Sequence, residues 1–243
     1  QALAELQQYR ERFPDGVMTD SAVEELARAA LAVGRPQEAV TALDGYEKTA
    51  SRAALVLLRA QAREQVAAAK AVPPLAAATD YLDVYYRFPL GEEARTAAVR
   101  MPALQATLGE QFPGTPLATQ IARAEAFNQA SRWNDLRSAY RELLPKVSGA
   151  ASERARLRIA RANAALGSGL AEMASLELTD PDLDSERLYL LSQEYRSKNL
   201  ESTMLETIER MMQFSSKPMS AMPNAGAPQR VENRNLYLCS PEY

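Results

Sequence analysis

Three arginines in the second half of the chain are the residues best suited to bind a ligand. Arg154, Arg158 and Arg161 are spaced four and then three residues apart, which places them on one face of a helix. A guanidinium group is a planar fork of N–H donors that can pair with a carboxylate through two hydrogen bonds. The row therefore predicts a surface for acidic side chains, a peptide C-terminus or an anionic polymer. A solvated charged face beside Glu153 is the simpler alternative.

Other polar residues extend this predicted surface to the corresponding faces of other predicted helices. They are Glu125, Asn128, Gln129 and Arg28. Together with the arginines they form a set of mixed sign, and the net charge of the chain is −3. This balance favours a protein or peptide partner and gives no bias toward nucleic acid. Ordinary solvent-exposed surface is the alternative reading of these residues.

The composition argues against catalysis and against a metal or cofactor. The chain contains no histidine and one cysteine, Cys239. The usual general base and the commonest metal ligand are therefore missing from the sequence. A single cysteine can form neither an internal disulfide nor a cysteine-based zinc site. We expect a non-enzymatic chain without a cofactor.

One acidic segment has the alternating carboxylates of a calcium loop, at Asp180, Asp182 and Asp184. A calcium-binding EF-hand loop also requires glycine at its sixth position and glutamate at its twelfth. Those positions hold Ser185 and Leu191. A loop between helices, with Asp184 as the N-cap of the next helix, is the better interpretation.

The residues between these candidates predict an all-α protein. Alanine, leucine, arginine, glutamate and glutamine dominate the sequence, and these residues favour helices. Valine, isoleucine and threonine form no alternating run of the kind that predicts a strand. No apolar run approaches the roughly 18 residues that a membrane-spanning helix needs.

Four bends divide the chain into helical hairpins, at Gly34, Ser131, Gly167 and Asn199. Successive bends are 97, 36 and 32 residues apart, close to three, one and one units of a period of about 34 residues. The long interval should hold about two further hairpins. We expect residues 51–70 and 73–89 to form one pair of helices, and residues 91–113 to form two short helices around Pro102.

Local signals support the first hairpin and the aromatic positions. Ser21 and Glu24 have the spacing of a capping box, and Pro36 suits the first turn of the helix after Gly34. Phe127, the single tryptophan Trp133, and Tyr140 fall where two packed helices need bulky side chains. We expect these three aromatic residues to pack between helices and not to form a ligand pocket.

The pattern resembles the tetratricopeptide-repeat superfamily, whose motif places small residues within the helices, a turn residue at the bend and an aromatic residue after it. The best matches are Ala124, Phe127, Ser131, Trp133 and Tyr140, followed by Ala27, Gly34 and Ala39, and more loosely by Ser192, Tyr195 and Asn199. Leu136 and Met204 depart from the motif, which usually has alanine there. The resemblance spans residues 1–214. It implies a right-handed superhelical solenoid of about six antiparallel hairpins with a concave groove.

Residues 13–27 and 112–124 resemble a pattern found in bacterial envelope repeat proteins. These include outer-membrane scaffolds for exopolysaccharide export and the superhelical domain of soluble lytic transglycosylases. The resemblance implies a periplasmic scaffold that binds a partner protein or peptide within an assembly such as polysaccharide export. The alternative that it implies is a helical accessory domain of a peptidoglycan lytic transglycosylase whose catalytic domain lies outside this chain. A cytoplasmic adaptor is a further alternative.

Residues 215–243 differ in character from the rest of the chain. They contain four prolines and end near an apolar patch of Leu236, Tyr237 and Leu238. We expect a proline-rich extended tail or linker. The patch is expected either to fold back over the last helix or to begin a further domain.

Overall fold

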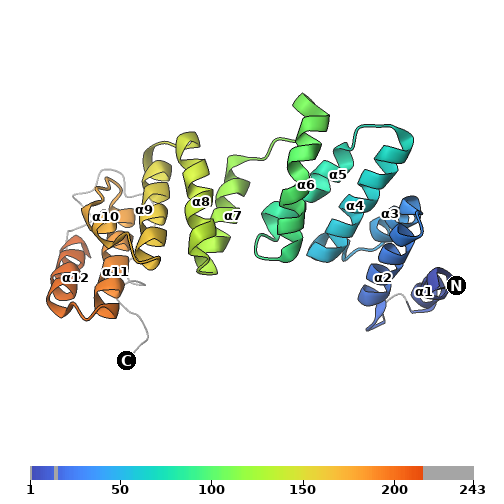
Figure 1. Cartoon of the computed structure of the whole chain (residues 1–243). Coiled ribbons are helices and arrows are strands. Elements are labelled where there is room, and N and C mark those ends of the chain that lie inside the picture. Colours follow the sequence, from blue (N-terminus) through green and yellow to red (C-terminus); the bar gives the residue numbers. More distant parts are fainter. Residues whose placement is uncertain (1, 14–15, 216–243) are drawn as a thin grey trace. The chain divides into compact units, whose positions relative to one another are not determined.

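The computed structural model of the chain describes residues 2–13 and 16–215, and every α-helix in that part is drawn and labelled in Figure 1. The helices are α1 (Ala2–Arg12), α2 (Thr19–Ala32), α3 (Pro36–Asp44), α4 (Ala53–Lys70), α5 (Leu75–Arg87), α6 (Glu92–Leu108), α7 (Leu117–Gln129), α8 (Trp133–Leu143), α9 (Gly149–Ala165), α10 (Leu170–Ser175), α11 (Pro181–Ser197) and α12 (Glu201–Ser215). These described residues form no strand, so the predicted all-α class is confirmed. Within the same ranges no helix has both the length and the apolar character needed to cross a membrane. The predicted tail lies outside the described residues, apart from Ser215.

A residue with positive φ ends the first helix of each of five helical hairpins. These residues are Gly34 (72°), Ala71 (52°), Ser131 (54°), Gly167 (91°) and Asn199 (56°). In every case the next residue donates its N–H to the carbonyl five positions earlier. The five bonds are Arg35 to Ala30 (2.8 Å), Val72 to Ala67 (3.0 Å), Arg132 to Phe127 (2.9 Å), Ser168 to Asn163 (2.9 Å) and Leu200 to Tyr195 (2.9 Å). This pattern satisfies helix-end carbonyls while the chain reverses. The four predicted bends are confirmed.

The interval between Gly34 and Ser131 differs in part from the prediction. α4 and α5 are confirmed as a pair, with their bend at Ala71. The prediction of two short helices around Pro102 is wrong, because α6 runs through this proline as a single helix. Pro102 itself is exposed. Ala97 before it and Leu104 after it are buried in one core, which holds both halves of the helix in place despite the missing N–H.

The start of α2 also differs from the prediction of a capping box at Ser21 and Glu24. The helix begins two residues earlier, at Thr19. Thr19 is buried, and its hydroxyl donates a hydrogen bond of 2.7 Å to the carbonyl of Phe13. This bond fixes the start of the helix before Ser21 is reached. Pro36 begins α3, as predicted.

The described residues divide into two packed units, with the boundary inside α7, after Ala126. In the first unit α2 contacts α3 and α4, and α4 contacts α5 and α6. In the second unit α9 contacts α8, α10 and α11, and α11 contacts α12. In each unit the main contacts thus join helices that are one or two positions apart along the chain.

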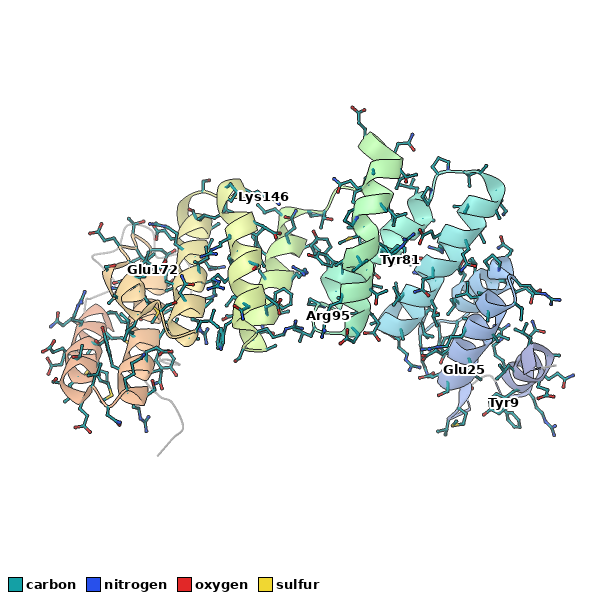
Figure 2. All side chains as sticks on the ribbon, in the orientation of Figure 1. Tyr9, Glu25, Tyr81, Arg95, Lys146 and Glu172 are labelled. Carbon is teal, nitrogen blue, oxygen red and sulfur yellow. The ribbon has the colours of Figure 1, made fainter. Side chains whose placement is uncertain are left out.

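Small side chains let the helices of the first unit pack closely. Ala60 of α4, Ala77 and Ala78 of α5, and Ala97 of α6 are fully or almost fully buried in one cluster. The large side chain at the centre of this cluster is Tyr81, which lies among α4, α5 and α6 (Figure 2). Its hydroxyl donates a hydrogen bond of 2.9 Å to Glu64 of α4. Burial, followed by this hydrogen bond, raises the pKa of the Tyr81 hydroxyl.

A buried carboxylate joins α5 to two arginines of α4. Asp80 is 3% exposed and accepts hydrogen bonds from Arg59 at 3.1 and 2.8 Å and from Arg63 at 2.9 Å. Arg63 also donates to Asp44, at the end of α3, at 2.8 Å. Charged hydrogen bonds in a buried setting are costly to break, because the remaining charges lose their partners. These polar contacts therefore fix α3, α4 and α5 relative to one another.

The left-handed bend predicts a position-specific effect of alanine on stability. Gly34→Ala should destabilise the chain by about 1 kcal/mol, because a Cβ disfavours positive φ, although no neighbouring atom would contact it. The free energy of unfolding in urea measures the change. Gly114→Ala is the matched control, since Gly114 has open space and no positive φ. Equal effects at the two positions would contradict the proposed strain.

The Asp80 cluster predicts that two aspartates of the same helix differ sharply in importance. Asp80→Ala should lower the free energy of unfolding by about 3 kcal/mol, because two largely buried guanidinium groups lose their buried carboxylate and keep only the more exposed Asp44. Asp83→Ala removes only an exposed ion pair with Arg87 and should cost about 0.5 kcal/mol or less. Urea unfolding followed by circular dichroism compares the two variants. Similar losses of stability in the two variants would contradict this prediction, because they would show that the burial of Asp80 adds nothing to the free energy of unfolding.

Candidate functional site

The predicted arginine row lies on α9, which runs parallel to α11 in the second unit. Arg158 of α9 donates a hydrogen bond of 2.6 Å to Glu186 of α11, which lies 28 positions further along the chain. Near the start of both helices, Glu153 accepts hydrogen bonds of 2.9 Å from the backbone N–H groups of Thr179 and Asp180. The similar offsets place the N-terminal ends of α9 and α11 together and keep the two helices in register.

The register defines a set of residues that we call the α9–α11 face. An offset of 28 places Arg154 level with Asp182, Arg158 level with Glu186, and Arg161 level with Tyr189. On α11 these partners are spaced four and then three residues apart, as the arginines are on α9. Glu186 and Tyr189 were not predicted as site residues, and Asp182 was considered only as part of a calcium loop, although this matching spacing is a signal by which all three could have been found.

The three predicted arginines have different environments. Arg154 is exposed. Arg158 is 8% exposed, and its charge is balanced by the carboxylate of Glu186. Arg161 is half-buried, with its guanidinium carbon 5.3 Å from the centre of the Trp133 ring of α8. The predicted row of equivalent ligand-binding arginines is thus a graded series, in which Arg154 alone is exposed.

The aromatic residues expected to pack between helices do so to different degrees. Phe127 and Tyr140 are both 2% exposed, as expected for packing residues. Trp133 is only partly buried, and the guanidinium of Arg161 covers its ring. An arginine over an indole ring is a favourable cation–π contact. Trp133 is therefore both part of the packing and an edge of the α9–α11 face.

The other predicted site residues lie outside this face. Glu125 and Asn128 are half-buried on α7, and Gln129 is exposed at its end. Arg28 lies on α2 of the first unit, where its exposed guanidinium pairs with Glu24 at 2.5 Å. The structure connects Arg158 and Arg161 of α9 to neighbouring helices, whereas it shows Arg28 as half of a local pair within one helix.

Two carboxylates at the start of α11, those of Asp180 and Asp184, make different contacts. Asp180 is the N-cap, and its side chain accepts hydrogen bonds from the N–H groups of Asp182 at 2.9 Å and Leu183 at 3.4 Å. The predicted cap at Asp184 is therefore wrong, because α11 begins three residues before it. Asp184 instead pairs with Arg187 at 2.6 Å. The signal for the true cap was Pro181, which favours the first position of a helix.

Glu153 stabilises this arrangement from the neighbouring helix. It accepts hydrogen bonds from the side chain and N–H of Thr179 and from the N–H of Asp180. These bonds, led by the Thr179 side chain and then the Asp180 backbone, lower the pKa of Glu153 below its ordinary value. A lowered pKa means that the folded state favours the carboxylate, so Glu153 stabilises the fold at neutral pH.

Neither a metal-binding cluster nor a similarity to known proteins assigns a role to the α9–α11 face. In the part of the chain that the structure describes, no three histidine, cysteine or acidic side chains gather where they could hold a metal ion. Comparisons with protein-family models, with curated proteins and with solved structures found no match to the chain. The geometry itself offers an exposed cation, a buried ion pair and two partly exposed aromatic rings on adjacent helices.

Glu153 predicts a pH dependence of stability in the second unit. Its stabilising effect should be fully present above its ordinary pKa and should be lost as the pH falls through the lowered pKa. Glu153→Ala should cost about 1–3 kcal/mol at pH 7, because the N–H groups of Thr179 and Asp180 lose a charged acceptor. It should also flatten the fall in stability as the pH drops below the ordinary glutamate pKa of 4.5. Unfolding curves read by Trp133 fluorescence test both effects, and an unchanged pH slope in the variant would contradict them.

Proposed function

We propose that the chain is a non-enzymatic scaffold that binds a partner protein or peptide on the α9–α11 face. The observation that carries this proposal is the graded arginine series. Arg158 is neutralised and fixed by Glu186, whereas Arg154 of the same row is exposed. A rigid helix pair with an exposed guanidinium at one end is better suited to binding the surface of another protein or peptide than to catalysing a reaction of a small molecule.

The charge pattern supports a peptide ligand over a polyanion. A polyanion requires several uncompensated positive charges, but Arg158 is already paired and Asp182 lies level with Arg154. A peptide with one acidic side chain can instead pair with Arg154 while its apolar atoms contact the partly exposed rings of Trp133 and Tyr189. We therefore infer a segment that presents one carboxylate next to apolar or aromatic residues.

The wider arrangement that we propose is the superhelical solenoid of tetratricopeptide-like repeats. Support comes from the five left-handed bends with the same hydrogen bond and from contacts between helices one or two positions apart in each unit. Repeats that touch only their neighbours produce extended binding surfaces made from successive first helices. α9 and α11 are both first helices of their hairpins. A periplasmic envelope assembly is our proposed setting, on the basis of the resemblance of residues 13–27 and 112–124.

Selection from a phage-displayed library of random peptides tests this function with no assumption about the partner. Peptides enriched on the chain should change the fluorescence of Trp133, because Arg161 of the binding face covers its ring. Arg154→Ala should weaken their binding by about 10–100-fold, since a hydrogen bond to a charged group contributes about 1.5–3 kcal/mol. Its unfolding curve should match that of the natural sequence, because Arg154 is exposed.

Arg95→Ala is the matched control for this experiment. Arg95 is an exposed arginine of α6 in the first unit that pairs only locally with Glu92 (Figure 2). Peptide affinity should be the same in this variant as in the natural chain. Failure to enrich any peptide, or equal affinities for the Arg154→Ala and Arg95→Ala variants, would contradict the proposed site.

A further inference from the structure

A pocket of about 180 Å³ in the first unit is lined by α1, α2 and α3. Its floor is apolar and consists of Leu26 and Ala30 of α2, Ala42 of α3 and Leu3 of α1. Leu26, Ala30 and Ala42 are at most 3% exposed. The two alanines carry only a methyl group, and this small size leaves the space of the pocket between the three helices.

The volume of the pocket suits a ligand with one apolar side chain. A cavity of about 150 Å³ lined by apolar side chains holds a molecule of the size of benzene, whereas pockets for drug-sized ligands measure about 300–1,000 Å³. At about 180 Å³ the pocket can hold the side chain of an aliphatic amino acid. It is too small for a nucleotide or for a cofactor of that size.

The α1 side of the pocket carries a guanidinium group that has no carboxylate partner among the described residues. This group belongs to Arg10, which is partly buried and donates a hydrogen bond of 3.4 Å to the carbonyl of Ala42. By contrast, every arginine of α2, α4 and α6 pairs with a carboxylate. A guanidinium has five N–H donors, so Arg10 can bind the carboxylate of a ligand with those that remain.

The α3 side of the pocket carries the opposite charge. Glu38 lines the pocket, and its carboxylate pairs with the exposed guanidinium of Arg35 at 3.4 Å. An exposed ion pair of this kind contributes little stability, so Glu38 can exchange it for the ammonium group of a ligand. In the described part of the chain Arg10 and Glu38 do not pair with each other. The pocket therefore presents one cationic and one anionic group at separate points beside an apolar floor.

We propose that this pocket binds a free aliphatic amino acid of the size of leucine. The guanidinium of Arg10 binds the carboxylate of the amino acid, and the carboxylate of Glu38 binds its ammonium group. The aliphatic side chain contacts Leu26 and Ala30, which removes apolar area from water. The two charged groups select a molecule that carries both charges next to one apolar side chain. This site lies in the first unit and does not depend on the function proposed for the α9–α11 face.

Titration of the full 243-residue chain with L-leucine tests the site, by calorimetry and by NMR chemical shifts of backbone amides. Binding should saturate by about 10 mM, ten times the Kd of a weak site of about 1 mM, and the largest shift changes should fall in α1, α2 and α3. N-acetyl-leucine lacks the ammonium group and leucinamide lacks the carboxylate. Each should bind about tenfold more weakly than leucine, because one charged hydrogen bond is lost. Alanine should also bind about tenfold more weakly, because its side chain is too short to cover the apolar floor.

Two substitutions change the charge of the pocket and leave its floor intact. Arg10→Gln keeps an N–H donor for the carbonyl of Ala42 and should weaken leucine binding by about 10–100-fold. Gln7→Glu, at an exposed position of the pocket rim, places a carboxylate three residues before Arg10 and should weaken binding by pairing with that guanidinium. Arg35→Gln is the matched control. It releases Glu38 from its surface pair, so the affinity for leucine should not fall, although the chain loses one positive charge.

Three results would overturn the proposal. The first is the absence of saturable leucine binding up to about 10 mM. The second is equal affinity for leucine and N-acetyl-leucine, which would make the ligand an acylated residue, such as the C-terminal residue of a peptide, and not a free amino acid. The third is leucine binding that shifts amides outside α1, α2 and α3, or that is unchanged in both the Arg10→Gln and the Gln7→Glu variants, which would place the site elsewhere.

Discussion

A left-handed residue at the bend lets each hairpin reverse the chain within a few residues without leaving helix-end carbonyls unpaired. The same hydrogen bond, from the residue after the bend to the carbonyl five positions earlier, occurs at all five hairpins. It fixes where one helix ends and from which direction the next one starts. The apolar faces of both helices then meet, and small residues such as Ala39 and Ala60 let the following hairpin approach. The packing of both units depends on this local constraint.

Many charged residues of the described chain contribute to this packing. Asp80 holds two arginines of α4, and Glu153 accepts hydrogen bonds from the backbone that leads into α11. Arg158 belongs to the same class through its pair with Glu186. This pairing does not extend to Arg154, and it is there and beside the ring of Trp133 that we propose a face for recognition. Structural ion pairs thus determine which members of a charged row are fixed within the fold and which are exposed.

The sequence predicted the features that depend on local chemistry. Gly34 and Asn199 tolerate positive φ, and Pro36 suits the first turn of a helix, so these bends and the helices beside them could be found from residue type. Ala71 could not, because alanine rarely adopts the left-handed conformation, and packing of α4 against α5 imposes it there. The continuity of α6 through Pro102 also depends on tertiary burial on both sides of the proline.

The candidate site was predictable only in part, for a similar reason. Helical spacing correctly placed Arg154, Arg158 and Arg161 on one helix. Spacing within α9 cannot show that Glu186 approaches Arg158, because that contact depends on the register between two helices. The proline-rich tail after residue 215 stays a prediction, since it lies outside the described residues.

Hydrogen exchange at single backbone amides, followed by NMR, tests the central constraint most directly. The relevant N–H groups belong to Arg35, Val72, Arg132, Ser168 and Leu200, each of which donates across a bend. We expect all five to exchange well below the rate of an unstructured chain, although each follows the end of a helix. Exchange at the unstructured rate in most of them would show that the bends are not fixed, and would contradict the account of how the hairpins form.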